Sequence, residues 1–387
     1  MRTLLTLILL AVTTPVLACT SFVLEDGDDL YFVHSLNQGS MPAVDGAAYL
    51  NPRGAWKDGY SFAALFDPED DSGPGLVWRS TYGSVTFSPL GKEMPDGGLN
   101  EAGLFIWEMG FDTEYPVDGT VPTLFQMQWM QYQLDNFATV DEVLANLDRV
   151  ILDGWGWHYF VADTQGGTAI IDFPDGRPEI FTGPTLPIPL CGNAYYPKVM
   201  QWLGETEGFG GDLPYRQEFS EIPRFITGAK RLQEYGGEDP VAYAFETLQA
   251  MSVNVRWSVV FDVTRGTAHF NTNLDAGIRS FAFGPEDYAA GRPVMMLDID
   301  TPGPGDVKDL FVPHEPRADE AYLRQILAMF HEDDGTDIAA LAARMAGRLA
   351  APLPLTKRDV GGFWQGTLTV MQRDESMETP LELILEE

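Results

Sequence analysis

Residues 19–37 read CTSFVLEDGDDLYFVHSLN, and this stretch decides the fold. Two runs rich in aromatic and β-branched residues flank a Gly-Asp turn at 26–29, a pattern that predicts a β-hairpin. Cys19, one of only two cysteines in the chain, stands directly before the first run. The pattern therefore predicts a thiol fixed at the start of a strand.

The segment before Cys19 has the composition of an export signal. A short charged start is followed by the apolar residues 3–14 and by a small-residue exit that ends at Ala18. Removal of residues 1–18 would make Cys19 the first residue of an exported protein, either periplasmic or secreted. No later stretch approaches the roughly 18 consecutive apolar residues of a membrane span.

Three interpretations of Cys19 remain open. Val-Leu-Ala-Cys loosely resembles a lipobox, although the strand that follows directly leaves no polar tether for a lipid anchor. Pairing with Cys191, the second cysteine, would give a disulfide in an oxidising compartment. As an N-terminal nucleophile, the thiol would use its own α-amine, with a reference pKa of about 8, as the general base.

Composition excludes several classes of function. The chain has 387 residues, of which 45% are hydrophobic, so it is long enough for one large domain or two ordinary domains. A net charge of -33 argues against binding to nucleic acid or to anionic membrane surfaces. With two cysteines and five histidines, of which His158 and His269 fit a core or edge position, we expect no metal and no cofactor.

Turn residues are dense and the apolar runs are short, which predicts a strand-rich fold with a few helices. Strands are expected at 20–25, 29–36, 46–51, 60–66, 75–79, 84–88, 103–110, 157–163, 167–173, 256–263 and 267–271. Helices are expected at 122–136, 141–150, 196–203, 222–235 and 239–250. Thr139 and Glu142 have the spacing of a capping box at the start of a helix.

The sequence predicts four segments. They are a signal peptide at 1–18, a main domain at 19–300, an acidic, proline-rich connection at 301–318, and a helical C-terminal extension at 319–387. The connection is the best candidate for a boundary or a long surface connection, because proline and acidic residues interrupt regular structure there.

Further motifs follow the opening hairpin in a fixed order. They are YGSVTFSPLGKEMPDGGLNEAGLFI, WHYFVADTQGGTAIIDF, CGNAYYPKVMQWL, IPRFITGAKRL and VRWSVVFDVTRGTAHFNT. Together the series covers residues 19 to about 285 and resembles the choloylglycine hydrolase and penicillin V acylase family of linear amide hydrolases. The resemblance implies an α+β fold, a four-layer αββα sandwich of the N-terminal nucleophile hydrolase type.

The resemblance also implies roles for matching residues. Cys19 would attack an amide carbonyl and form a thioester that water hydrolyses. The side-chain amide of Asn193 would donate to the oxyanion, and Arg224 would favour the thiolate. The substrate would be a small N-acyl amide, with bile-salt conjugates, penicillin V and acyl-homoserine lactones as open alternatives, and family members often form homo-oligomers.

Six aromatic residues near the expected site suit either an apolar acyl group or an ordinary core. They are Tyr31, Phe32, Trp107, Phe111, Trp129 and Tyr195.

Two positions depart from the family pattern. Where the family usually has a basic residue and, three positions on, an aspartate, this chain has His34 and Asn37. The charge of His34 depends on pH, and Asn37 lacks the carboxylate that would hold the protonated α-amine. A second polar oxyanion group, expected within 107–110, has no clear equivalent. These departures leave two hypotheses: a working amidase, or a catalytically weak binding protein, soluble or lipid-anchored.

Overall fold

The computed structural model describes most of the chain after the expected signal peptide. The described residues are 19–37, 44–252, 255–331 and 335–350, together with the backbone of 362–372 and 375–385. The predicted signal peptide at 1–18 lies outside the described residues.

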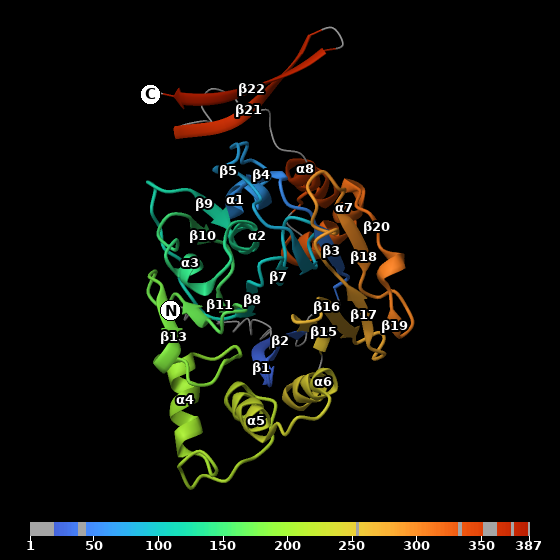
Figure 1. The fold of residues 1–387 in the computed structure, drawn as a ribbon. Helices are drawn as coiled ribbons and strands as arrows, with labels where there is room; N and C mark the ends of the chain where they lie inside the picture. The colour runs from blue at the N-terminus through green and yellow to red at the C-terminus, as the bar shows by residue number, and fades with distance from the viewer. Residues whose placement is uncertain are drawn as a thin grey trace, which may run out of the picture.

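The opening hairpin lies inside a seven-stranded sheet (Figure 1), as the sequence predicted. Its two strands pair antiparallel around Gly27, whose φ of 63° is readily adopted by glycine. The strand order is β14 (Leu190–Cys191), β1 (Thr20–Asp26), β2 (Asp29–Asn37), β15 (Val255–Asp262), β16 (Thr267–Thr272), β17 (Arg279–Ala282) and β19 (Gly305–Asp306). We call this the first sheet.

A second sheet has nine strands. Their order is β13 (Glu179–Thr182), β12 (Thr168–Asp172), β11 (Trp157–Ala162), β8 (Phe105–Gly110), β7 (Gly97–Asn100), β6 (Ser84–Ser88), β3 (Ala47–Asn51), β18 (Met295–Asp298) and β20 (Val312–Pro313). All neighbouring strands in this sheet pair antiparallel.

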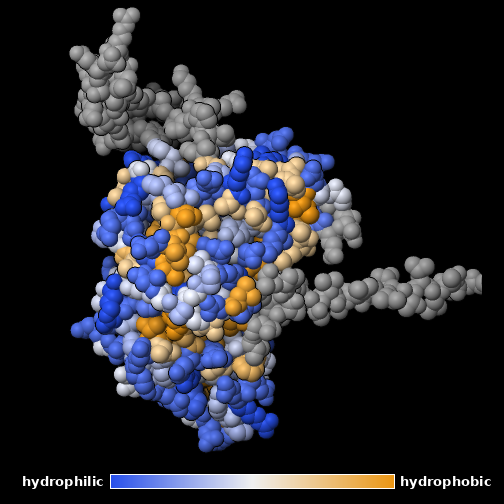
Figure 2. Space-filling model, turned by 90° about the vertical axis from the view of Figure 1, so that its right-hand side faces the viewer, coloured by the Kyte–Doolittle hydropathy of each residue, from blue (hydrophilic) through white to orange (hydrophobic). Residues whose placement is uncertain are grey.

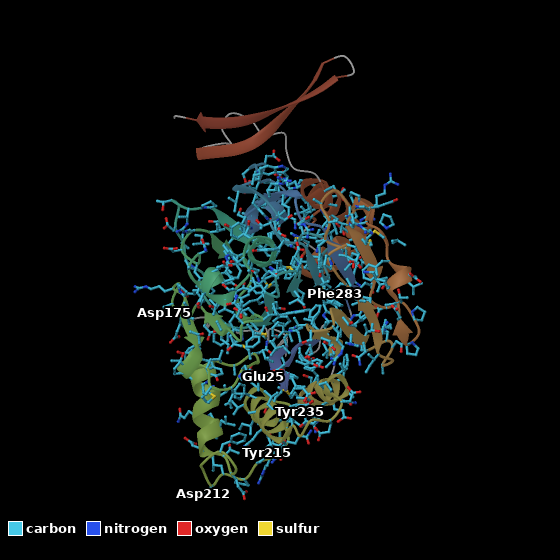
Figure 3. All side chains as sticks on the ribbon, in the orientation of Figure 1. Glu25, Asp175, Asp212, Tyr215, Tyr235 and Phe283 are labelled. Atoms are coloured by element: carbon cyan, nitrogen blue, oxygen red, sulfur yellow. The ribbon has the colours of Figure 1, made fainter. Side chains whose placement is uncertain are left out.

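The two sheets pack face to face through aromatic side chains. Phe32 of the first sheet lies 5.3 Å from Phe105 of the second, between ring centroids, and Phe87 lies 6.2 Å from Phe261. Side chains fill the space between the ribbons (Figure 3). Each such ring buries about 150–250 Å², and apolar burial contributes about 25 cal/mol per Å², so this interface is the main source of stability.

Helices cover both outer faces (Figure 1). α5 (Glu221–Glu234) and α6 (Pro240–Met251) pack on the first sheet. α2 (Gln126–Asn136) packs on β7 and β8, and α7 (Pro316–Phe330) adds Tyr322 to a cluster with Tyr49 and Met296 on the second sheet. The predicted αββα sandwich is confirmed.

The remaining elements are short or peripheral. They are β4 (Trp56–Gly59), α1 (Phe62–Phe66), β5 (Leu76–Arg79), β9 (Thr123–Phe125), α3 (Val140–Leu144), β10 (Ile151–Asp153), α4 (Tyr196–Glu205), α8 (Ile338–Ala350), β21 (Gly362–Gln372) and β22 (Glu375–Leu385). One-turn 3-10 helices occupy Gly183–Thr185 and Lys308–Leu310.

Three local predictions need correction. The strand expected at 60–66 is helix α1, because the Ser61 side chain accepts a hydrogen bond from the backbone of Ala64 and caps a helical turn. The helix expected from residue 122 begins at Gln126, after the short strand β9. The helix expected at 141–150 ends at Leu144, although its capping box is present.

The expected connection contains short strands. Within 301–318, β19 pairs with β17 and β20 pairs with β18, so this stretch adds an edge strand to each sheet. Proline is tolerated at such an edge because no ladder donor is lost there. The expected helical extension contains α7 and α8, but it ends in the β21 and β22 hairpin.

The surface carries both polar and apolar residues. Figure 2 shows one face that is mostly hydrophilic, with separate hydrophobic patches among the polar residues. Among the described residues, no helix combines the length and the hydropathy needed to cross a membrane.

The close packing of β7 against β8 gives a stability prediction. A Cβ added to Gly97 would lie 2.2 Å from Cδ2 of Trp107 and 2.7 Å from the carbonyl oxygen of Ile106. We expect Gly97→Ala to lower the free energy of unfolding by about 1–3 kcal/mol, measured by urea denaturation. Gly73→Ala is the matched control, because nothing lies within 4 Å of its Cβ position. Equal stability of the two variants would contradict this packing.

Candidate active site

The candidate nucleophile lies where two chain segments meet. Cys19 stands directly before β1, and its side chain is fully buried. The register of β1 against β14 pairs Ser21 with Cys191, so the chain that leaves β14 passes beside Cys19. Strand pairing therefore places Gly192 and Asn193 at the thiol, although 174 residues separate Cys19 from Asn193 in the sequence.

Gly192 shows how close the segments are. A Cβ placed on Gly192 would lie 3.5 Å from Nη2 of Arg224 and 4.0 Å from the carbonyl oxygen of Cys19. Arg224 comes from α5, where it is 1% exposed. The structure thus brings together Cys19, Asn193 and Arg224, the three residues that match the family motifs.

Hydrogen bonds fix the orientation of the Asn193 amide. Nη2 of Arg224 donates to Oδ1 of Asn193 at 2.8 Å, and Nδ2 of Asn193 donates to the carbonyl oxygen of Gly110 at 2.8 Å. A primary amide has two N–H donors, so one remains after the bond to Gly110. Because Arg224 can only donate, the atom it contacts must be the amide oxygen of Asn193. The second N–H of Nδ2 then remains available to donate to an oxyanion.

Several groups set the pKa of the Cys19 thiol. Burial raises the pKa well above its ordinary value, and the carboxylates of Glu108 and Asp96 raise it further. A hydrogen bond from the backbone of Asn37 and the positive charge of Arg224 lower it. Burial outweighs the two stabilising contacts, so in the full-length chain the thiol is protonated at neutral pH.

Asn37 therefore acts on the thiol through its backbone. Asn37 lies at the end of β2 and is 3% exposed, and its main chain pairs with Val255. The sequence predicted a change in how the Asn37 side chain holds the α-amine, whereas the contact that reaches Cys19 comes from the backbone amide, which any residue supplies.

The surroundings of His34 do not favour the pH-dependent charge that the sequence predicted for it. Its ring is fully buried, stacks on Trp107 with centroids 4.3 Å apart, and bonds through Nδ1 to Oγ of Ser21 at 2.8 Å. Burial lowers the pKa of His34 well below its ordinary value and so favours the neutral ring. Its Nε2 lies 3.8 Å from Oδ2 of Asp96. His34 supports the inner face of the hairpin and supplies no charge to the thiol.

A buried pair of carboxyl groups lies beside the site. Asp96 and Glu108 share a hydrogen bond, and both are almost fully buried. Burial raises the pKa of Asp96 to about 6, while burial and the charge of Asp96 raise that of Glu108 well above its ordinary value. The hydrogen bond between the two carboxyl groups requires one proton, which the pair shares, and Nε1 of Trp107 donates to Oδ2 of Asp96 at 2.7 Å.

The two cysteines are both free thiols. Cys191 lies opposite Ser21, and Cys19 comes two residues before Ser21, directly before β1. With about 3.4 Å of rise per residue and about 5 Å between strands, their Cα atoms are about 8 Å apart. A disulfide requires less than about 7 Å, so joining them would need backbone movement.

The six aromatic residues fall into two groups. Tyr31, Phe32, Trp107 and Trp129 are at most 1% exposed and belong to the core. Phe111 and Tyr195 are half-buried, stack with centroids 6.4 Å apart, and directly follow segments that hold the site. Of the six, Phe111 and Tyr195 are the two that keep some exposed surface.

Comparisons with known proteins bear out the resemblance. A penicillin V acylase from Pectobacterium atrosepticum is 33% identical over 154 residues, which are 32% of this chain and 40% of that protein. The structure of penicillin V acylase from Agrobacterium tumefaciens matches with a TM-score of 0.65 and 23% identity, over 77% of this chain and 98% of the other. The chain has the penicillin V acylase fold. No family model matches it.

A mutant conjugated bile acid hydrolase from Clostridium perfringens shares the same fold. It matches with a TM-score of 0.58 and 13% identity, over 75% of this chain and 99% of the other. The predicted resemblance to the choloylglycine hydrolase and penicillin V acylase family is thereby confirmed, and these similar proteins are amide-cleaving hydrolases. The curated match spans two fifths of its relative, so the activity of this chain is taken up below as a proposal.

Sequence reasoning missed the charged groups that surround these residues. Asp96 lies in the motif PDGGLN. Glu108 lies in IWEMG, within 107–110, where a polar group was expected but not identified. An acidic residue within an otherwise apolar strand was the available signal. Among the described residues, no three potential ligands cluster in a way that could hold a metal ion.

Opposing variants test the charges around the thiol. Arg224→Gln should raise the pKa of the Cys19 thiol, and the double variant Asp96→Asn/Glu108→Gln should lower it, because the first removes an attraction and the second a repulsion. The measurement is the pH dependence of Cys19 alkylation in the full-length chain, followed by peptide mass spectrometry.

Glu25→Gln is the control for this experiment. Glu25 is exposed near the far end of β1 (Figure 3), so its charge should leave the alkylation profile unchanged. A double variant whose profile moves to higher pH would contradict the arrangement.

Proposed function

We propose that this chain, after removal of residues 1–18, is an exported cysteine amidohydrolase that cleaves a linear N-acyl amide. The observation that carries the proposal is the fixed Asn193 amide beside Cys19, with Arg224 holding its oxygen and one N–H left available. Oriented donors of this kind stabilise a tetrahedral oxyanion without reorganisation, which is often the largest single contribution to catalysis.

The proposed reaction begins with the new N-terminus. Removal of residues 1–18 converts the backbone nitrogen of Cys19 into an α-amine, which takes the thiol proton directly or through one water molecule. The sulfur attacks the amide carbonyl, and the oxyanion accepts a hydrogen bond from Asn193. Collapse breaks the C–N bond, the protonated α-amine returns its proton to the leaving amine, and a thioester remains.

Water completes the cycle. The free α-amine removes a proton from a water molecule, which attacks the thioester carbonyl and releases the acid and the thiol. A base is required because burial keeps the thiol protonated, and neutral His34 is directed toward Ser21 and Asp96. The α-amine is therefore the base in this proposal.

The substrate class follows from the surroundings and the relatives. Phe111 and Tyr195 offer an aromatic, half-exposed surface next to Asn193, which suits an apolar acyl group. A penicillin V acylase and a conjugated bile acid hydrolase share the fold. N-acyl amides with aryl or steroid acyl groups are thus the first small-molecule substrates to test, with acyl-homoserine lactones as a third class.

A second candidate function is that of a catalytically weak binding protein, soluble or anchored through an acylated Cys19. The observation in its favour is Asn37, which offers no carboxylate to a protonated α-amine at this end of β2. Intact-mass measurement of the mature protein separates the two. A chain that begins with an unmodified Cys19 fits the amidase, and an added diacylglyceryl mass fits the anchored binding protein.

Side-chain replacement tests the catalytic assignment. Cys19→Ala should abolish amine release from N-acyl substrates, while Asn193→Ala should lower kcat by about 10²–10³-fold with a smaller change in KM, because the lost donor acts mainly on the transition state. Asn146→Ala, in the turn that follows α3 and outside the site, should retain wild-type turnover. Full activity of Cys19→Ala would rule out the proposal.

A further inference from the structure

His158 is a buried histidine that the proposed reaction does not use. It lies on β11 and is 0% exposed. Its Nδ1 lies 2.7 Å from Oδ1 of Asp172, and its Nε2 lies 2.6 Å from the carbonyl oxygen of Gly192, the residue before Asn193. Both distances are short, so both ring nitrogens are engaged in hydrogen bonds.

The partners of His158 determine its protonation. A backbone carbonyl can only accept a hydrogen bond, so Nε2 must carry a proton. Against an ionised carboxylate, which only accepts, Nδ1 carries a second proton. A ring with both protons is an imidazolium, and it forms charge-assisted hydrogen bonds that are stronger than neutral ones.

The surrounding charges agree with this state. Burial works against a charged ring, but Cys191 and Asp172 more than offset it and raise the pKa of His158 well above its ordinary value. Glu108 on β8 feels the ring as a positive charge that lowers its own pKa. Arg224 on α5 acts on Cys191 and lowers its pKa.

The hydrogen bond from His158 to Gly192 connects the two sheets at the site; we call His158 and Asp172 the clamp. His158 and Asp172 belong to the second sheet, whereas Gly192 directly follows β14, the edge strand of the first sheet. Asn193 makes a parallel connection through its bond to Gly110 on β8. The turn that carries the candidate oxyanion donor is thus attached to the second sheet by two hydrogen bonds.

We propose that His158 is a positioning residue, whose imidazolium, paired with Asp172, holds the Gly192 carbonyl and so fixes Asn193 relative to Cys19. The inference rests on the proposed function for its kinetic consequence. Gly192 has no side chain of its own to restrain its peptide groups, which is why an external clamp is needed there. A displacement of about 1 Å in a catalytic group can cost about 10²-fold in rate.

The Cys191 thiol does not explain the arrangement. Its sulfur lies 3.7 Å from Nε2 of His158, further than the Gly192 oxygen at 2.6 Å. Burial raises the pKa of Cys191 despite the attraction of His158, and the thiol is shielded from solvent. Buried thiols of this kind are unreactive. The carbonyl of Gly192 is therefore the functional partner of the ring.

Kinetics provide the first test. His158→Leu should lower kcat for N-acyl amide hydrolysis by about 10²-fold with KM within about threefold of wild type. His158→Gln should recover part of that loss, because a side-chain amide can still donate to the Gly192 carbonyl. His269→Gln on β16 is the matched control and should keep wild-type kcat. A folded His158→Leu variant with wild-type kcat would overturn the proposal.

The charge state of the ring provides a second test that needs no activity. In the ¹⁵N-labelled protein, the five histidines are resolved by ring NMR, and His158 is assigned by its absence in His158→Gln. We expect both ring nitrogens of His158 to remain protonated at pH 8, and Asp172→Asn to make the ring titrate at lower pH. A neutral ring in the wild type at pH 8 would overturn the clamp.

The two readouts separate failure of the inference from failure of the proposed function. If the wild-type protein hydrolyses no N-acyl amide, the proposed function fails, and the NMR result still decides whether the clamp exists. If the wild-type protein is active and the ring is neutral, the proposed function stands and the inference falls.

Discussion

The site depends on one structural interaction, the insertion of β1 between β2 and β14. Pairing with β2 puts Asn37 beside the start of β1, and pairing with β14 brings Gly192 and Asn193 to the same point. Because Cys19 directly precedes β1, the thiol lies where both neighbours end. Backbone hydrogen bonds of a sheet define this position more firmly than a loop could, which suits a group that must be held to a fraction of an ångström.

Burial makes the same position electrostatically demanding. Removing the Cys19 thiol from water favours its neutral form, and the nearby carboxylates act in the same direction. Arg224 is the opposing charge, and it also orients the Asn193 amide, so one guanidinium serves two purposes. The balance explains why a base at the N-terminus is needed in the proposed reaction: the site supplies an oriented donor, but it does not supply a preformed thiolate.

The sequence predicted the hairpin and the sandwich because alternating strands and ordered motifs record local structure and family resemblance. It also singled out Cys19, Asn193 and Arg224, which lie within those motifs. It could not predict the shared proton of Asp96 and Glu108, which depends on the register between β7 and β8. The neutral state of His34 likewise depends on burial between the sheets. The edge strands within 301–318 escaped prediction because two residues of pairing leave almost no periodic signal.

The central claim is that Cys19, as the first residue of the mature chain, carries the acyl group during turnover. The most direct measurement is acid quenching of the mature protein during hydrolysis of an N-acyl-4-nitroanilide, followed by peptide mass spectrometry. The account predicts a hydroxylamine-labile acyl mass on a peptide that begins at Cys19, since a thioester at that residue is the proposed intermediate. An acyl mass on Cys191, or turnover by a chain in which Cys19 remains joined to residue 18, would contradict it.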